Sequence, residues 1–284
     1  MRVEKLAVFR GLYLGDLVSA TGALRALRRG YPEAEISLVS LPWATALAPH
    51  LPHVDRLIPY PGAPGLDGGG TAEETEQFLA RMRTEHFDLA VNMHGRGPAS
   101  TRLVSSFGAR RTASFFCGTG EEFPLLDVAV SWDAEEHESR KLLVLAERAG
   151  GKPNGPEPEL LIREEDYHRV QALLRANLRK PLALVHPGAS VSEKRWPEER
   201  FGRMAEALVR RGYTVAVTGS ADEKELTRRV SRAGRRISRP SSRSWAGRAS
   251  WSPTIPAPPT SPTPQRSQAS PSSGRLRTWG GGDR

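Results

Sequence analysis

The stretch Leu6-Ala-Val-Phe-Arg-Gly-Leu-Tyr-Leu-Gly-Asp16 decides the fold of the first part of this chain. Its first four residues form a short apolar run of the kind that builds a buried strand, and residues 16–29 then repeat apolar side chains at helical spacing. A glycine-bearing turn joins the two. In such a unit the free N–H groups of the helix start and the helix dipole face a ligand beyond the carboxyl end of the strand. The stretch therefore predicts a strand, a turn with a binding site, and a helix.

A second stretch, far away in the sequence, repeats this pattern. Leu182-Ala-Leu-Val-His-Pro-Gly-Ala-Ser190 combines an apolar strand with a glycine-bearing turn, and Lys194-Arg-Trp196 precedes a further helix with Pro197 in its first turn. The two stretches together predict two α/β lobes, each with a site at a strand end.

Strands and helices alternate along most of the chain, which is typical of parallel sheets. The expected strands are 6–9, 36–39, 55–59, 89–93, 112–116, 182–185 and 214–217, and the expected helices are 16–29, 72–85, 135–149, 164–177, 197–211 and 222–230, with another opening at 94–98. Residues 150–158 are rich in Gly and Pro and predict a linker. We therefore expect domains at 1–150 and 159–232, followed by a tail at 233–284.

Composition limits the class of protein. A chain of 284 residues with 38% hydrophobic content is long enough for two α/β domains. Cys117 is the only cysteine, so no intrachain disulfide can form and a reducing compartment is expected. No apolar run is long enough to cross a bilayer, and the first residues resemble a strand and not a signal peptide. These features predict a cytoplasmic protein.

The net charge of +9 is concentrated in the tail. Residues 231–284 contain 10 Arg, no Lys, one Asp and no Glu, so the preceding residues carry equal numbers of basic and acidic side chains. A basic body would indicate a polyanionic partner, but a neutral body with a basic tail does not. We expect no nucleic-acid partner.

The two stretches, with the turn Thr218-Gly-Ser220, resemble glycosyltransferase family 9, the heptosyltransferase-like enzymes of bacterial envelope polysaccharide synthesis. The resemblance runs from about Val3 to Val230. It implies an α/β fold of two Rossmann-like lobes, called GT-B, in which 1–150 is the acceptor-side domain and 159–232 an incomplete nucleotide-sugar-binding domain.

The resemblance also implies an activity. This is an inverting, metal-independent transfer of a sugar, with heptose as one alternative, from a nucleotide diphosphate-sugar to a lipopolysaccharide-like or other envelope glycan acceptor. No cofactor is expected, the nucleotide-sugar being a substrate. A monomer is expected, and peripheral contact with the inner face of the membrane stays an open alternative.

For the first turn, the resemblance makes Asp16 the catalytic base that takes the proton of the acceptor hydroxyl. The alternative from the residues alone is that Asp16 caps the helix start. Gly15, His94 and Arg96 are expected near the acceptor if the fold is right, although a surface-loop role is equally open for the latter two.

For the second lobe, Lys194 is expected to stabilise the departing diphosphate together with Ser190 and a helix N-terminus, which would replace a metal ion. Gly188 and Gly219 would let the backbone approach the nucleotide, and Glu223 or Asp222 would accept hydrogen bonds from ribose hydroxyls. The remaining expectations are that Arg195 assists or is exposed, Trp196 packs, and His186 is a core residue.

The tail departs from every preceding pattern. It is rich in Ser, Pro and Arg and contains Trp245, Trp251 and Trp279, a composition that predicts disorder and also fits a GC-rich gene translated out of frame. Read one base out of register, the codons for 253–262 permit an Asp-Thr-Gly turn, which the family has after an apolar strand. We expect a frameshift after about residue 230. The alternative function is a non-catalytic, truncated remnant of such an enzyme.

Overall fold

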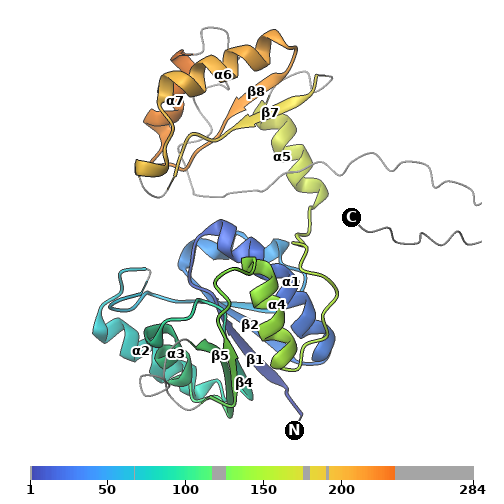
Figure 1. Ribbon diagram of the computed structural model, residues 1–284, viewed down its shortest axis with the longest axis vertical. Coiled ribbons are helices and arrows are strands. Elements are labelled where there is room, and N and C mark those ends of the chain that lie inside the picture. Colours follow the sequence, from blue (N-terminus) through green and yellow to red (C-terminus); the bar gives the residue numbers. More distant parts are fainter. Residues whose placement is uncertain (1, 67, 117–125, 175–179, 190–191, 234–284) are drawn as a thin grey trace, which may run out of the picture. The chain divides into compact units, whose positions relative to one another are not determined.

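The computed structural model describes residues 2–66, 68–116, 126–174, 180–189 and 192–233 (Figure 1). Its N-terminal portion is built on a six-stranded parallel sheet with the order β3-β2-β1-β4-β5-β6. The strands are β1 (Lys5–Phe9), β2 (Glu35–Ser40), β3 (Arg56–Pro59), β4 (Leu89–Asn92), β5 (Arg111–Phe116) and β6 (Val128–Ser131). The α/β class with parallel sheets is thus as predicted.

Helices cover both faces of this sheet (Figure 1). The helices α1 (Leu14–Gly30) and α4 (Glu138–Arg148) pack together on one face, and α2 (Ala72–Thr84) and α3 (Pro98–Ser105) on the other. Two short 3-10 helices, η1 (Pro42–Ala46) and η2 (Ala48–His50), follow β2. Because both faces are covered, the central strands β1 and β4 are buried along nearly their whole length and are mostly apolar.

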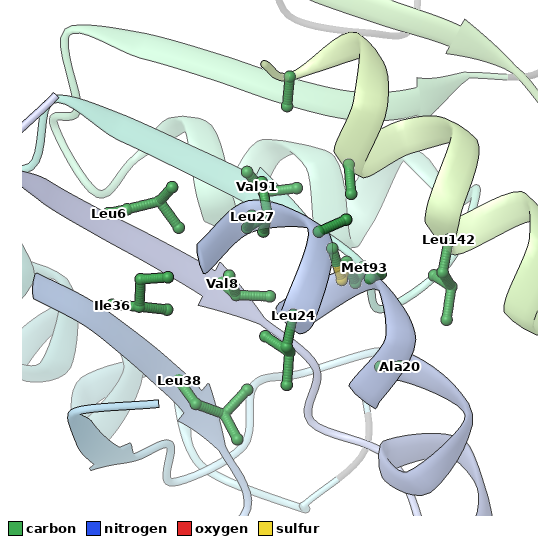
Figure 2. Close-up of a cluster of buried hydrophobic side chains, with 14 of the residues drawn as sticks. Leu6, Val8, Ala20, Leu24, Leu27, Ile36, Leu38, Val91, Met93 and Leu142 are labelled. Carbon is green, nitrogen blue, oxygen red and sulfur yellow. The ribbon is translucent and has the colours of Figure 1, made fainter. Parts of the chain in front are cut away.

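The core beneath α1 holds the quoted stretch in place. Figure 2 shows Leu6 and Val8 of β1 facing Leu24 and Leu27 of α1, with Leu142 of α4 beside them. All five side chains are essentially inaccessible to solvent. Burying one such side chain stabilises the fold by about 2 kcal/mol relative to leaving it exposed. This packing fixes the turn between β1 and α1 from both ends.

The C-terminal portion has a two-stranded parallel sheet of β7 (Leu182–Val185) and β8 (Thr214–Val217). It also contains η3 (Ser192–Lys194), α6 (Glu198–Arg210) and α7 (Lys224–Ala233). Ala205 of α6 packs with Val185 of β7 and Val215 of β8 in its small buried cluster.

Residues 152–166, which we call the strap, bind along the N-terminal sheet domain. The Glu159 N–H donates to Thr21 Oγ1 at 2.9 Å, and the Glu159 carboxylate accepts from Arg25 at 2.9 Å. The Leu161 N–H donates to the His50 carbonyl at 2.9 Å. The last three residues of the strap form the start of α5 (Glu164–Leu174). The predicted boundary between residues 150 and 159 thus falls in a segment with specific contacts, and the boundary itself stays a prediction.

The expected strands and helices are all present, with ends that differ by a few residues. The strand β6 was not predicted; its Val128 and Val130 alternate with exposed Ala129 and Ser131 at the edge of the sheet. None of the helices within the described ranges is both long and apolar enough to cross a membrane. Cys117 and the tail at 234–284 lie outside the described residues.

Candidate functional site

Asp16 lies in the first turn of α1, just beyond the carboxyl end of β1. Its carboxylate is partly exposed, with 42% of the side chain accessible. One oxygen, Oδ2, accepts the Tyr13 backbone N–H at 3.3 Å, which is the capping contact considered above. The other, Oδ1, lies 3.7 Å from an Arg10 terminal nitrogen. Capping therefore engages one oxygen and leaves part of the carboxylate open to solvent.

Arg10, the residue after β1, is completely buried. Its Nε–H donates to the Asp16 backbone carbonyl at 2.9 Å, and one terminal nitrogen donates to the Met93 carbonyl. Both terminal nitrogens donate to Glu138 Oε1 at 3.2 Å. Burial lowers the pKa of Arg10, and the Glu138 and Asp16 carboxylates oppose that decrease. The buried Arg10 side chain thus connects the end of β1 with α1, the loop after β4 and α4.

Glu138 is the first residue of α4, and its second oxygen lies 3.3 Å from Lys141 Nζ. Lys141 is buried and lies over the Trp132 ring, 3.9 Å from its centroid. Arg96, which is exposed, also lies over this ring at 5.8 Å. A chain of charged and aromatic contacts thus connects the predicted acceptor residue Arg96 with Asp16.

His94 is buried against the turn and stacks on Phe9 with the ring centroids 4.8 Å apart. Its Nδ1 accepts the Gly11 backbone N–H at 3.2 Å. The backbone of His94 is held in turn by Asn92 Oδ1, whose amide group donates to three hydroxyls beneath α3, those of Ser100, Thr101 and Ser114. His94 therefore shapes the β1–α1 turn, and its predicted contact with an acceptor stays a prediction.

Gly15 is exposed at the start of α1, next to Asp16. A Cβ atom built on it would have no neighbour within 4 Å. The protein itself therefore does not need glycine there for packing, and the surface beside Asp16 is open to a ligand.

In the C-terminal portion, the turns after β7 and β8 meet at Gly188 and Gly219. A Cβ atom on Gly188 would collide with the Glu223 carboxylate, and one on Gly219 would lie 2.6 Å from Thr227 Cγ2. Glu223 Oε2 accepts the Ser220 N–H at 2.8 Å. Glu223 thus lies directly against Gly188, and Asp222, the alternative, is exposed. The geometry brings Gly188, Gly219 and Glu223 together, and their binding of the nucleotide stays a prediction.

Lys194 is exposed at the end of η3, in the loop before α6. Its neighbour Arg195 closes this loop by donating to the Ala189 carbonyl from Nε at 3.2 Å and from a terminal nitrogen at 2.9 Å. Trp196 packs edge to face on Phe201 with the centroids 5.3 Å apart. The expected packing contact of Trp196 is thus present, and 43% of the residue is exposed. Ser190 lies outside the described residues.

The expectation for His186 was wrong. It was predicted as a core histidine because it ends a buried strand, but the structure places it at the surface, with Nδ1 3.2 Å from Thr218 Oγ1. The two-stranded sheet is too narrow to bury the residue beyond its strand end. His186 instead links the turns after β7 and β8.

Sequence reasoning missed Arg10 and Glu138. The signal for Arg10 was present, since a basic residue follows a buried strand directly and precedes Asp16 by only six positions. Glu138 lies 128 residues from Arg10, and without the fold nothing in its local sequence distinguishes it from the acidic residues around it.

Comparison with known proteins agrees with this architecture. The lipopolysaccharide heptosyltransferase 2 of Salmonella typhimurium is 25% identical over 231 residues, which cover 78% of this chain. The aligned part is 65% of that relative, so the chain spans less than two thirds of the length of the curated relatives that it matches.

Solved structures show the same fold. The glycosyl transferase family 9 structure from Veillonella parvula superposes with a TM-score of 0.67 at 22% identity, covering 82% of this chain and 67% of that one. The Escherichia coli ADP-heptose lps heptosyltransferase II gives 0.64 at 21% identity, with 81% and 68% covered.

The family model of glycosyltransferase family 9 (heptosyltransferase) matches residues 76–238, more than half of the chain. The matched region includes the loop of His94 and Arg96, Glu138, and all of the turns after β7 and β8. The chain therefore belongs to glycosyltransferase family 9.

Proposed function

We propose that this chain is a glycosyltransferase of the inverting, metal-independent kind, which moves a sugar from a nucleotide diphosphate-sugar to a lipopolysaccharide-like or other envelope glycan. The observation that carries the proposal is the placement of Asp16. A carboxylate outside the end of a central parallel strand, partly exposed and held on both sides, is well placed to act on a bound hydroxyl.

In the proposed reaction, the acceptor hydroxyl oxygen attacks the anomeric carbon of the donor while Asp16 takes its proton. The bond from that carbon to the diphosphate breaks, and the diphosphate leaves with the electron pair. A carboxylate is a weak base for a sugar hydroxyl, but it suffices when proton transfer accompanies attack, because the hydroxyl becomes acidic only as the new bond forms. One displacement inverts the anomeric configuration.

On the donor side, the leaving diphosphate gains negative charge and needs a cation. Lys194 is exposed in a loop whose shape is fixed by Arg195, and the N-terminal turn of α6 follows within a few residues. An ammonium group and free helix N–H groups are suitable partners for a phosphate. Glu223, next to Gly188, is proposed to accept hydrogen bonds from the ribose.

The relatives suggest the substrates to test. Their names specify heptosyltransferases acting on lipopolysaccharide, and one solved relative is named for ADP-heptose. ADP-heptose with a heptose-deficient lipopolysaccharide is therefore the first pair, with UDP- and GDP-sugars as alternative donors. The assay uses the 284-residue chain and a frame-restored protein, in which the reading frame after about residue 230 is shifted by one base.

The expected result is release of the nucleoside diphosphate that requires the acceptor, continues in excess EDTA, and gives a product of inverted configuration by NMR. A retained configuration or a rate abolished by EDTA and restored by a divalent cation would contradict the proposed mechanism. Absence of both transfer and ADP binding in both proteins would favour the alternative of a non-catalytic remnant. Cytoplasmic location, peripheral membrane contact and a monomeric state remain further proposals.

A further inference from the structure

The buried guanidinium of Arg10 is shared by two carboxylates in unequal ways. Glu138 Oε1 accepts from both terminal nitrogens at 3.2 Å, whereas the Asp16 carboxylate lies at 3.7 Å from one of them. Glu138 therefore engages the cation by hydrogen bonds, and Asp16 has only a longer ion pair. The Asp16 backbone carbonyl, which accepts from Nε, anchors the start of α1 to the same guanidinium.

Glu138 is itself held firmly. Its other oxygen lies 3.3 Å from Lys141 Nζ, and Lys141 is buried over Trp132. The carboxylate thus bridges two cations at the start of α4, and only 33% of its side chain is accessible. An acidic residue with this environment cannot move away from Arg10 without leaving two buried cations short of a partner, which is costly.

We infer that Glu138 is a positioning residue for Asp16. This inference rests on the proposed function, in which Asp16 is the base. By binding the guanidinium, Glu138 keeps Arg10 from forming a close ion pair with the Asp16 carboxylate. Such an ion pair would occupy the Asp16 oxygen that takes the proton of the acceptor hydroxyl. Arg10 in turn fixes the position of the first turn of α1 through its hydrogen bond to the Asp16 carbonyl.

The alternative for this network is purely structural, since Arg10 also connects β1, α1 and α4. A structural role and a positioning role of Glu138 predict different results. A structural role changes the stability of the protein, whereas a role exerted through Asp16 changes the turnover rate only when Asp16 is present. A double-mutant cycle measures this dependence.

The variants are Glu138→Gln, Asp16→Asn, the double variant, and Glu147→Gln as a matched control on the exposed side of the same helix. They are made in whichever of the 284-residue chain and the frame-restored protein transfers sugar. Glu138→Gln keeps the size of the side chain and removes its charge. It should lower kcat by about 10- to 100-fold, the range expected when a reacting group is misplaced, with the donor KM unchanged. In the Asp16→Asn background it should have no further effect, and Glu147→Gln should match the parent.

The inference is overturned if Glu138→Gln leaves kcat unchanged, or if its effect is as large in the Asp16→Asn background as in the parent. Failure of the proposed function gives a different result, since Asp16→Asn would then keep the parent kcat. A variant that changes the melting temperature but not kcat would assign Glu138 to the fold alone and would equally overturn the inference.

Discussion

At the scale of single residues, the two glycines predicted to approach ligands differ in what surrounds them. Gly15 has open space where a Cβ atom would lie, whereas a Cβ atom on Gly188 would collide with the Glu223 carboxylate. Neither residue has the positive φ that only glycine tolerates well. An alanine at either position therefore tests whether there is room for a Cβ atom, and not whether the backbone is strained.

Gly188→Ala should displace the Glu223 side chain, because the carboxylate is the movable partner in that contact. Glu223 would lose its hydrogen bond from the Ser220 N–H, at a cost of about 1 kcal/mol in unfolding free energy. If Glu223 binds the ribose, the affinity for ADP should fall about tenfold, as for loss of one hydrogen bond to a charged group. Isothermal titration calorimetry measures the affinity.

Gly15→Ala is the matched control for that experiment. It should leave the ADP affinity unchanged and keep or slightly raise the melting temperature, because alanine restricts the unfolded chain and fits the helix start. Wild-type ADP affinity in Gly188→Ala would show that Glu223 does not contact the nucleotide.

At the scale of elements, the sequence predicts best where burial decides the structure. The strands β1 and β4 are buried and mostly apolar, and the helix α1 has a buried apolar face, so their positions follow from the hydrophobic pattern of the sequence. The edge strand β6 lacks such a run and was missed. The strap was expected from its Gly and Pro content only as a linker, because its contacts are with backbone groups and side chains that are distant in the sequence.

The same distinction explains what was predicted of the site. Asp16, Gly188 and Lys194 lie in turns that directly follow or precede predictable elements. The contacts of Arg10 with Glu138, and of Glu223 with Gly188, depend on how separate units fold together. His186 was predicted wrongly because a strand end in a two-stranded sheet is less buried than one in a full sheet.

The strap provides a prediction about pH. Hydrogen bonds from His53 and then Arg25 lower the pKa of Glu159. A lowered pKa in the folded state contributes stability above the unfolded value of about 4.3 and loses it as the pH falls through the folded value. Because 41% of the Glu159 side chain is exposed and solvent screens its ion contacts, Glu159→Gln should lower the unfolding free energy at pH 7 by at most about 1 kcal/mol, with the difference shrinking below about pH 4.

Denaturant unfolding at several pH values measures this difference. Glu157→Gln serves as a control, since Glu157 is 75% exposed and its nearest contact with Arg25 is 3.9 Å. A difference for Glu159→Gln that stayed constant or grew toward pH 3 would contradict the assigned ion contacts.

The strap also predicts the extent of the N-terminal folding unit. Leu160 packs against the core beneath α1, and Leu161 and Arg163 bond to backbone groups at His50 and Pro49. A fragment of residues 1–166 should therefore melt cooperatively and at a higher temperature than a fragment of residues 1–150. Circular dichroism melting of both fragments tests this, and equal melting temperatures would place the strap outside the unit.

At the scale of the whole molecule, the charge and the composition change together after about residue 230. The preceding residues carry balanced charge and fold into α/β units, and residues 231–284 hold the entire net charge of +9. The simultaneous change in charge and composition is the reason for predicting a frameshift after about residue 230. Residues 234–284 lie outside the described part of the chain.

Resequencing the gene across codons 225–260 from independent isolates tests that prediction. We expect one missing or extra base and a restored frame that encodes an Asp-Thr-Gly turn after an apolar run. An intact frame that encodes the printed tail in every isolate would refute the frameshift, and the tail would then be native.

The central claim is that Asp16 acts on the acceptor and Lys194 on the donor diphosphate. The most direct measurement is the turnover rate of Asp16→Asn and Lys194→Ala beside their affinity for ADP, in the protein that transfers sugar. Asp16→Asn should lower kcat by about 10²- to 10⁴-fold with ADP affinity nearly unchanged. Lys194→Ala should weaken ADP binding and slow transfer by about 10²- to 10³-fold. If Asp16→Asn instead abolished ADP binding while Lys194→Ala left it intact, the two assignments would be wrong.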